Sequence, residues 1–474
     1  MEHYGVLTLI PAFGFLVLAL VTRKTITSIV ISGLAGYFIY YKFGFVVPSL
    51  EALVDACTDW DNCYIVVICL LFGCLVQLLR AAKGPMAFGD LVRRYANTQK
   101  KTLIATWIAG LIIFIDDYLS ILVTANTILP VADEHKTPRE MLCYVINTTS
   151  APVCVIIPIS AWVVFFSGIF EAQPETAVIA STGMGIYYKI MPYFFYPFVC
   201  VIFVPLVILG IVPLMGGMKK AYQRVEETGK LWPPSSDIMN KDSLTGTTEP
   251  EVSTPTGAIA SKEEAEREFE PRLWTFLVPM IIVIAITIWQ GDILIGVAAG
   301  IVSCLLYIPA GIMSFGKFCD MCYKGLEDML FIGVVLVTSL FYRESMLLVG
   351  LPEFIIEVAG PFMSAALLPA IVFIVVGLIC FATGNIWSIP AVTTPIVVPL
   401  AVAVGAHLPL TLGAIISAAV FGAQACFYSD VVLLSASACK VNNVDYCIAQ
   451  LPYIIIVAAM STVFFLIAGF VLAV

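Results

Sequence analysis

Two adjacent carboxylates, Asp116 and Asp117, lie in the middle of a long apolar run. The run covers residues 103–131 and reads LIATWIAGLIIFIDDYLSILVTANTILPV. A charge at bilayer depth costs about 3 kcal/mol even on the lenient insertion scale, so a neighbouring pair is kept there only beside a cation, a partner or water. With Tyr118 and Ser120, the stretch offers hard oxygen ligands that suit Na⁺ or a proton. The alternative is that one Asp caps a helix N-terminus by accepting backbone N–H bonds.

Polar residues interrupt three other apolar runs. They are Asn147, Thr148, Thr149 and Ser150 before Pro152, then Thr383, Gly384 and Asn385, and finally Gln424, Tyr428, Ser429 and Asp430. Unwound backbone at such positions exposes carbonyls to a cation and amides to an anion. The alternatives are helix packing by small polar residues, a plain kink, or a cap. Trp162 and Trp387 could line a pocket, or could anchor at an interface or pack in a core.

These observations divide the polar residues into two predicted sets. The predicted ion ligands are Asp116, Asp117, Ser120, Asn147, Thr148, Thr383, Asn385 and Asp430, with Na⁺ placed at Asp116 and Asp117. The predicted solute ligands are Tyr118, Thr149, Ser150, Trp162, Trp387, Gln424, Tyr428 and Ser429. No phosphate-binding glycine loop is visible, and Ser160 has no partnered His nearby in sequence. We therefore expect no enzyme, no catalytic residue and no cofactor other than the coupling ion.

The composition indicates which elements must hold these residues. The chain has 474 residues, of which 60% are hydrophobic and 12% are charged, and its mean hydropathy is +1.00. These values are typical of a polytopic helical membrane protein. The net charge of -9 argues against nucleic-acid binding. Most of the 14 cysteines lie in apolar runs as small hydrophobes, and the isolated Cys319 and Cys322 pair lacks the four ligands of a closed zinc site.

The distribution of Lys and Arg suggests how the acid-bearing run lies. Loops rich in these residues favour the cytoplasmic side, which places the basic loop at 80–101 inside. The run at 103–131 is then either one long tilted helix or a hairpin that enters and returns with Asp116 and Asp117 near its tip. Only the hairpin puts the acidic loop at 171–175 outside and the basic residues at 219–224 inside. We therefore favour the hairpin.

The rest of the chain repeats this pattern. Residues 216–271 are polar and rich in Pro, Ser and Thr, which predicts a flexible cytoplasmic linker between membrane parts 1–215 and 272–474. The second part contains another over-long apolar stretch, 363–404, and another broken helix. We predict an all-α polytopic membrane protein with two inverted repeats, each of about five spans plus a re-entrant hairpin and a broken helix, an arrangement found in many secondary transporters.

Several segments resemble one known family. Residues 114–162, FIDDYLSILVTANTILPVADEHKTPREMLCYVINTTSAPVCVIIPISAW, are similar to the DDY and PRE...APV...PIS-W region of the NhaC-type sodium/proton antiporters. FATGNIWSIPAVTTPI, and SDVVLLSASA followed by QLPY, are similar to later parts of the same family. The resemblance implies membership of the ion transporter superfamily, whose members are commonly homodimers that move a hairpin-bearing domain like an elevator. We expect a multi-pass protein of a prokaryotic inner membrane.

The chain also departs from the family pattern. Asn147 stands where the family usually has Asp, and Gly422-Ala423-Gln424 replaces Gly-Asp-His. The resemblance predicts an ion-coupled secondary transporter that binds Na⁺ and/or H⁺ at mid-membrane and works by alternating access. The missing titratable groups favour the alternative, a Na⁺- or H⁺-coupled carrier or exchanger of an amino acid, amine or carboxylate. A passive channel is the third possibility.

Overall fold

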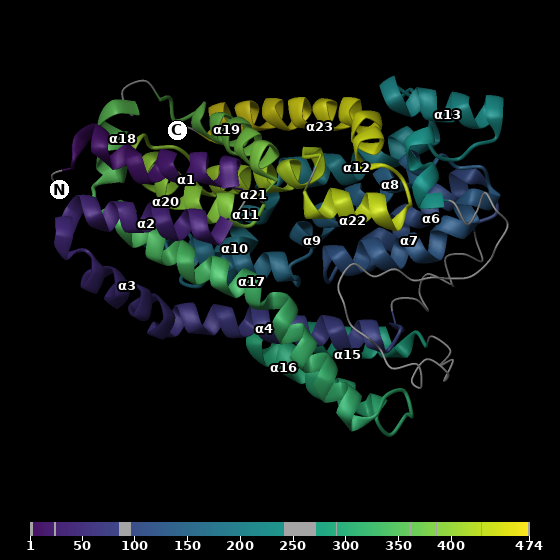
Figure 1. Cartoon of the computed structure of the whole chain (residues 1–474), viewed down its shortest axis with the longest axis horizontal. Coiled ribbons are helices and arrows are strands. Elements are labelled where there is room, and N and C mark those ends of the chain that lie inside the picture. The colour runs from purple at the N-terminus through teal and green to yellow at the C-terminus, as the bar shows by residue number, and fades with distance from the viewer. Residues whose placement is uncertain are drawn as a thin grey trace.

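The computed structural model describes residues 3–22, 25–84, 96–240, 272–290, 292–359, 363–384, 386–427 and 429–472. These residues form helices and their connections, and no strand occurs among them (Figure 1). Four of the described helices are long and apolar enough to cross a membrane, or up to six spans if each of two bent pairs counts as one. Asn385, Tyr428 and residues 241–271 of the predicted linker lie outside the described residues.

A first group of α-helices lies in the described residues up to residue 240. They are α1 (Leu9–Thr22), α2 (Thr25–Tyr41), α3 (Val46–Thr58), α4 (Trp60–Ala81), α6 (Gln99–Ile112), α7 (Asp117–Glu134), α8 (Arg139–Thr148), α9 (Ala151–Ile156), α10 (Ala161–Glu171), α11 (Gly183–Ile190), α12 (Phe195–Leu209) and α13 (Gly216–Thr228). The second half follows the same plan. Its helices are α15 (Trp274–Gln290), α16 (Ile293–Cys304), α17 (Phe315–Leu348), α18 (Leu351–Ala359), α19 (Leu368–Thr383), α20 (Ser388–Ala403), α21 (Leu408–Ala425), α22 (Asp430–Ala438) and α23 (Asn443–Leu472).

The acid-bearing run folds as a helical hairpin of α6 and α7. The chain leaves the helical region at Ile113 and re-enters it after Asp116. The far ends of the two helices meet, since Gln99 Nε2 donates to the Lys136 carbonyl at 2.9 Å and His135 Nε2 lies 3.0 Å from the Ala96 carbonyl. These contacts require antiparallel helices, so the hairpin is confirmed over a single long helix. Its entry into the membrane from one side stays a prediction.

The second over-long stretch is also a pair of antiparallel helices. Gly377 of α19 faces Ala418 of α21, and Cys380 one turn later faces Gly422, so α19 and α21 run in parallel. Because α20 connects them, it must return in the opposite direction. Gly384, with a φ of +66°, ends α19 at the tip, where a residue without Cβ is favoured.

One constant spacing relates the two halves. The first residues of α6 and α19 are Gln99 and Leu368. The first residues of α8 and α21, Arg139 and Leu408, are separated by the same number of residues, a separation that we call the repeat spacing. The start of α17 also lies one repeat spacing after Val46, the first residue of α3. Several helices of the two described halves therefore begin at the same spacing and in the same order.

The two broken helices share their capping pattern at the repeat spacing. Ser160 accepts from Val163 N as N-cap of α10, and its hydroxyl donates to a carbonyl six residues back at 2.6 Å. Ser429 does the same for α22, accepting from Val432 N and donating to a carbonyl six residues back at 2.6 Å. Such caps satisfy backbone amides at a restarted helix. The predicted break at 422–430 is confirmed.

The first-half break extends further along the chain than the sequence predicted. Helix α8 does end at Thr148, inside the predicted interval 147–152, and α9 begins at Ala151. A bend of 46° lies further on, between Ile156 and Ala161. Pro158 explains it, because proline removes a backbone donor and keeps the preceding residue out of the helical region. Ile157 is accordingly extended, with ψ of 123°.

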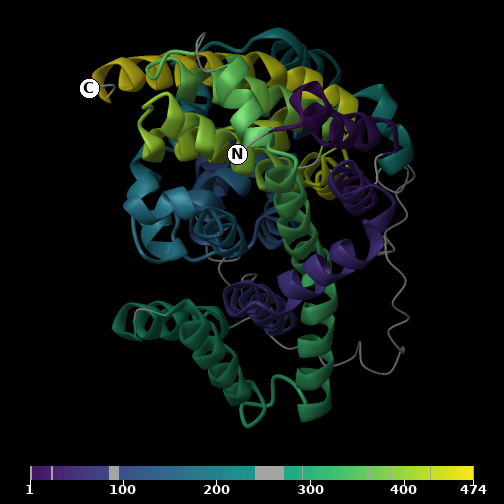
Figure 2. The same ribbon diagram turned by 90° about the vertical axis from the view of Figure 1, so that its left-hand side faces the viewer.

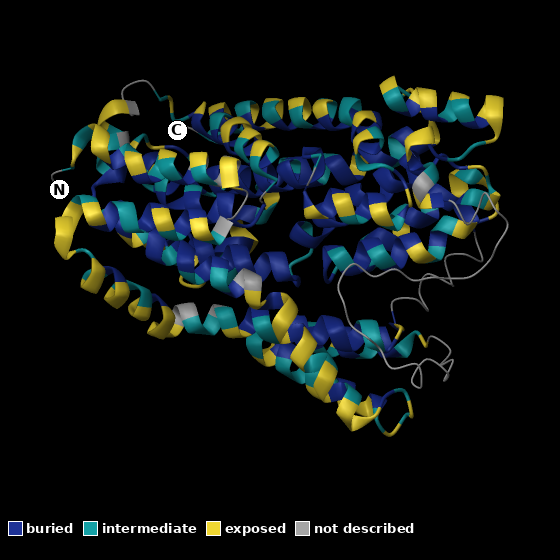
Figure 3. Ribbon diagram, in the orientation of Figure 1, coloured by how far each residue is buried: buried dark blue, intermediate teal, exposed yellow. Residues whose placement is uncertain are grey.

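The helices separate into a buried interior and a more exposed part. In an apolar 18-residue window of α21, 89% of the residues are buried, whereas in the corresponding window of α23 only 28% are buried (Figure 3). Helices α15, α16 and the start of α17 project away from the hairpins (Figure 2). Helix α4 crosses α17 where Gly73 meets Gly325, a contact that two residues without side chains permit. The described part of the predicted linker begins with helix α13, which packs on α23.

Candidate functional site

The first hairpin tip buries two carboxylates with different surroundings. Asp116 is the N-cap of α7, and its Oδ1 accepts from Leu119 N at 2.7 Å. Asp117 Oδ1 accepts from Tyr118 N at 3.2 Å. Asp117 Oδ2 is buried and has no hydrogen-bond partner within the described residues. The capping interpretation therefore applies to Asp116, whereas Asp117 keeps an unsatisfied acceptor.

A third carboxylate comes from the other half of the chain. Asp430 opens α22, which packs against α7, and Tyr118 Oη donates to Asp430 Oδ2. Asp430 Oδ1 accepts from Val431 N at 2.9 Å. Asp430 and Asp117 also lie close enough for their charges to interact. Among the described parts of the chain, none of these three carboxylates forms an ion pair within 4 Å.

The second hairpin tip is aromatic where the first is acidic. The Trp387 ring lies 4.6 Å from Trp162 at the start of α10 and 5.0 Å from Phe165, measured between ring centroids. Trp162 is fully buried, interacts with Asp117, and its Nε1 has no partner that meets hydrogen-bond geometry in the described structure. Trp387 lies one repeat spacing after Tyr118. Each tip thus contacts the restarted helix of the opposite half.

The hydroxyls predicted as ligands are mostly used within their own helices. Thr148, Thr149 and Thr383 each donate to the carbonyl four residues earlier, at 2.5, 2.8 and 2.8 Å. Ser150 donates to the Asn147 carbonyl at 2.9 Å. This is the back-bonding that small polar residues adopt in packed helices. Their oxygens still have lone pairs, so a ligand role for them stays a prediction, as it does for the buried Ser120.

Asn147 and Gln424 meet in a buried network of uncharged groups. Asn147 Nδ2 donates to Tyr446 Oη at 2.7 Å, and Tyr446 donates to Gln450 Oε1 at 2.6 Å. Gln450 Nε2 donates to the Gln424 carbonyl at 2.8 Å, and Tyr196 Oη donates to Gln424 Oε1 at 2.8 Å. The network joins α8, α12, α21 and α23. Sequence reasoning missed Tyr446, Gln450 and Tyr196, although polar residues four apart in the long apolar α23 were a visible signal.

A cation that the sequence placed in a loop lies near the acid pair. Arg80 occupies the last turn of α4, and its charge acts on Asp116. Its Nε is buried without a hydrogen-bond partner among the described residues. One turn earlier, Gln77 donates to Asp328 of α17, whose charge also reaches Asp116. The spacing of Gln77 and Arg80 at the end of an apolar helix could have identified them.

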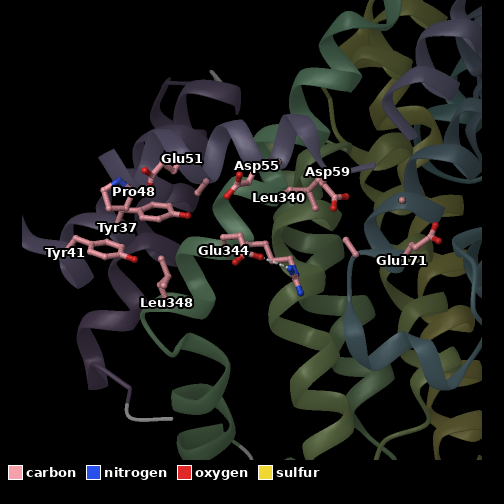
Figure 4. Close-up of a pocket in the computed structure, with 15 residues that line it drawn as sticks. Tyr37, Tyr41, Pro48, Glu51, Asp55, Asp59, Glu171, Leu340, Glu344 and Leu348 are labelled. Atoms are coloured by element: carbon pink, nitrogen blue, oxygen red, sulfur yellow. Dashed lines mark hydrogen bonds and ion pairs between the residues drawn. The ribbon is translucent and has the colours of Figure 1, made fainter. Parts of the chain in front are cut away.

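An acidic cavity of about 590 Å³ opens elsewhere, among α2, α3, α10 and α17 (Figure 4). Its carboxylates are Glu51, Asp55, Asp59, Glu171 and Glu344. Arg343 donates to Glu344 at 2.9 Å and to Gln173 at 3.3 Å. The hairpin acids do not line this cavity. Its negative potential would concentrate cations on this face, which the loop charges predict to be outside.

Comparison with known proteins finds a matching family, a related sequence and similar solved folds. Residues 153–470 match the Na⁺/H⁺ antiporter family. An uncharacterized protein of Haemophilus influenzae is 25% identical over 492 residues, covering 98% of this chain and 91% of that one. The fold is similar to the YdaH transporter of Alcanivorax borkumensis, with a TM-score of 0.61, 13% identity and coverage of 91% and 90%. It is also similar to MtrF of Neisseria gonorrhoeae, described with a class of antimetabolite efflux pumps, with a TM-score of 0.57, 11% identity and coverage of 91% and 85%.

Proposed function

The chain belongs to the NhaC-like Na⁺/H⁺ antiporter family and is a multi-pass secondary transporter, not an enzyme, and from this premise we propose where it binds its ion. Na⁺ and/or H⁺ binds at the first hairpin tip, held by Asp117 and Asp430 with Asp116 beside them. The carrying observation is that Asp117 Oδ2 is buried with no partner among the described residues, next to two further carboxylates. Buried carboxylates without cations are costly, so Na⁺ or a proton stabilises them.

Competition at one site can couple two fluxes. Carboxylate, phenol and carbonyl oxygens are hard ligands suited to a desolvated Na⁺. The same carboxylates bind protons, so Na⁺ and H⁺ exclude each other there and each can drive the other across the membrane. The finer assignment to Na⁺/H⁺ exchange rests on this shared site and on the family.

An unequal packing of the two halves supports alternating access. In the second half, α20 packs on α17, with Ala391 and Leu340 lining one small void. At the equivalent place of the first half, the described residues of α7 have no comparable packing on α4, and Figure 1 and Figure 2 draw these helices apart. This favours a state in which the second hairpin is packed on α17 and the first hairpin, on the predicted cytoplasmic side, is not packed on α4. In the opposite state, two inverted repeats would exchange these contacts.

Paired cysteines test this exchange. Leu71 and Leu122 lie one repeat spacing before Leu340 and Ala391. In a cysteine-depleted chain, Leu340→Cys with Ala391→Cys should cross-link in the present state, and Leu71→Cys with Leu122→Cys in the opposite one. Na⁺ and pH gradients should raise one yield while lowering the other. Cross-linking of the first pair alone, under every gradient, would contradict alternating access of this form.

Proteoliposomes test the ion assignment. A Na⁺ pulse into vesicles carrying the wild-type chain and a pH-sensitive dye should collapse a preformed pH gradient. Asp117→Asn should abolish this, because the buried carboxylate that both ions need is gone. Glu344→Gln, in the separate acidic cavity, is the matched control and should retain most of the exchange. Equal activity of Asp117→Asn and wild type would refute the site.

The second candidate is an ion-coupled carrier of a small organic solute. It is favoured by the Trp162 and Trp387 pair beside Asp117, and by the uncharged amides of Asn147 and Gln424. Aromatic rings bind organic groups and organic cations. A site for Na⁺ and H⁺ alone needs neither the aromatic pair nor the amides. Saturable counterflow of a labelled amino acid, amine or carboxylate would support this candidate. Proton movement driven by Na⁺ with no solute present would favour the exchanger.

A further inference from the structure

A cavity of about 700 Å³ lies along the seam between α13 and α23, far in sequence from the hairpin acids. Helix α13 is amphipathic, burying Met218, Ala221 and Val225. Gly217 sits against Ala449 of α23, where a Cβ would come within 2.9 Å of the Ala449 Cα. The cavity is lined by the charged residues Glu140, Lys220, Arg224 and Asp445 and by apolar residues of α23.

Two of the charged side chains in this cavity form an ion pair with each other, and the other two form no ion pair with the described residues. Arg224 and Glu140 cancel each other in a bidentate pair at 2.8 and 2.9 Å. Lys220 is exposed and forms no hydrogen bond or ion pair with the described residues. Asp445 accepts from Ser235 with Oδ2 only. One ammonium on α13 and one carboxylate on α23 are thus available to a ligand.

The apolar wall continues along α23 toward the membrane. Ile448, Leu451 and Ile455 are spaced three and four residues apart, so they share one helix face. Ile448 is 50% exposed and Ile455 is 56% exposed. Helix α23 begins at Asn443 and is a candidate membrane span, which places Asp445 at its end and the isoleucines progressively deeper. The polar groups of the cavity therefore lie directly beside an apolar surface that can hold acyl chains.

We propose that this cavity binds an aminophospholipid. Its phosphate pairs with Lys220, its primary ammonium pairs with Asp445, and its acyl chains lie over Ile448, Leu451 and Ile455. A zwitterionic headgroup matches the balance of one ammonium and one carboxylate that form no ion pair with the described residues. Phosphatidylcholine lacks the N–H donors that a carboxylate accepts, and phosphatidylglycerol lacks the cation. The linker would thereby be held to the bilayer on its predicted cytoplasmic face.

Native mass spectrometry of the full chain tests the lipid and its two charges. The protein in detergent is titrated with phosphatidylethanolamine, phosphatidylcholine and phosphatidylglycerol of identical acyl chains. We expect wild type to retain phosphatidylethanolamine about fivefold over phosphatidylcholine, the upper range of a partly exposed ion pair. Asp445→Asn and Lys220→Gln should each remove this preference. Lys219→Gln, one residue away and outside the cavity, is the matched control and should keep it.

Two further arms separate the alternatives. Ile455→Trp, which fills the groove without changing charge, should lower retention of all three lipids, so the test survives if Asp445→Asn fails to fold. Excess inorganic phosphate should leave bound phosphatidylethanolamine in place. Equal retention of the three lipids by wild type, equal losses in Lys219→Gln and Lys220→Gln, or displacement by inorganic phosphate would each overturn the proposal.

Discussion

Asp116 and Asp117 are adjacent in sequence but have different physical roles. Asp116 Oδ1 caps α7, whereas Asp117 Oδ2 is buried with an acceptor that nothing in the described structure satisfies. A cap contributes to helix stability whether or not an ion is present. An unsatisfied buried carboxylate oxygen, by contrast, gains most when a cation arrives. We therefore propose that the pair combines a structural acid, Asp116, with an ion-binding acid, Asp117.

This difference predicts that substitutions of the two residues change thermal unfolding in different ways. Asp116→Ala should lower stability without Na⁺ by about 1 kcal/mol, the usual cost of a lost N-cap. Asp117→Asn should leave the Na⁺-free protein near wild type but remove the rise in unfolding temperature on adding Na⁺. That rise corresponds to about 2.7 kcal/mol at a hundredfold excess over Kd. A sodium-dependent shift of wild-type size in Asp117→Asn would contradict the assignment.

Arg80 predicts a second effect at the same scale. Its positive charge on α4 opposes a cation at Asp116. Arg80→Gln should therefore lower the Na⁺ concentration for half-maximal transport, by about tenfold if the lost interaction is near 1.4 kcal/mol. Lys83→Gln, on the exposed turn that follows, is the control and should change it little. Weaker Na⁺ binding in Arg80→Gln would show that the guanidinium supports the site instead.

Elements position these residues through the hairpin and the helix breaks. The hairpin could be predicted, because an acid pair inside an apolar run and the loop charges are both visible in the sequence. The Tyr118–Asp430 contact could not, since it joins residues 312 positions apart. The bend near Pro158 was not predicted because the polar residues before Pro152 are the more visible interruption of this apolar run. The roles of Asn385 and Tyr428 at the site stay predictions, because both residues lie outside the described residues.

The uncharged network is an element-scale feature that can be tested. Gln424 connects α21 to α12 and α23 through its side chain and its carbonyl. Gln424→Leu leaves the Tyr196 hydroxyl without its acceptor, which should cost about 1–3 kcal/mol of unfolding free energy. If the network is only structural, this variant should lose stability while its Na⁺ affinity stays the same. An altered Na⁺ affinity with unchanged stability would make Gln424 a ligand, as the sequence suggested.

The start of the linker carries a pH prediction. Hydrogen bonds from Lys230 and from Trp232 Nε1 hold the pKa of Asp237 below its usual range. A lowered pKa means that these contacts are fully present above the ordinary Asp pKa and are lost as pH falls through the lowered value. The protection of the amides of residues 230–240, measured as the exchange rate relative to the intrinsic rate at the same pH, should therefore be unchanged between pH 8 and pH 6 and lower near pH 3. Asp237→Asn should show the lower protection already at neutral pH and lose the dependence on acid.

At the scale of the whole molecule, the repeat spacing organises both halves, yet their sites differ. The first tip has Asp116, Asp117 and Tyr118, and its counterpart ends in Ile386 and Trp387. The repeat could be predicted from the pattern of apolar runs. Its unequal packing, with α20 against α17 and no comparable packing of α7 on α4 among the described residues, is a matter of tertiary contacts and is invisible in the sequence.

Binding of ²²Na⁺ to the purified full-length chain tests the central claim most directly, because it needs neither a gradient nor a known solute. Wild type and Glu344→Gln should bind ²²Na⁺ saturably, and bound ²²Na⁺ should fall as added protons compete. Asp117→Asn and Asp430→Asn should each lose most of this binding, since the site draws on both halves. Saturable binding of wild-type strength in both variants would contradict the account.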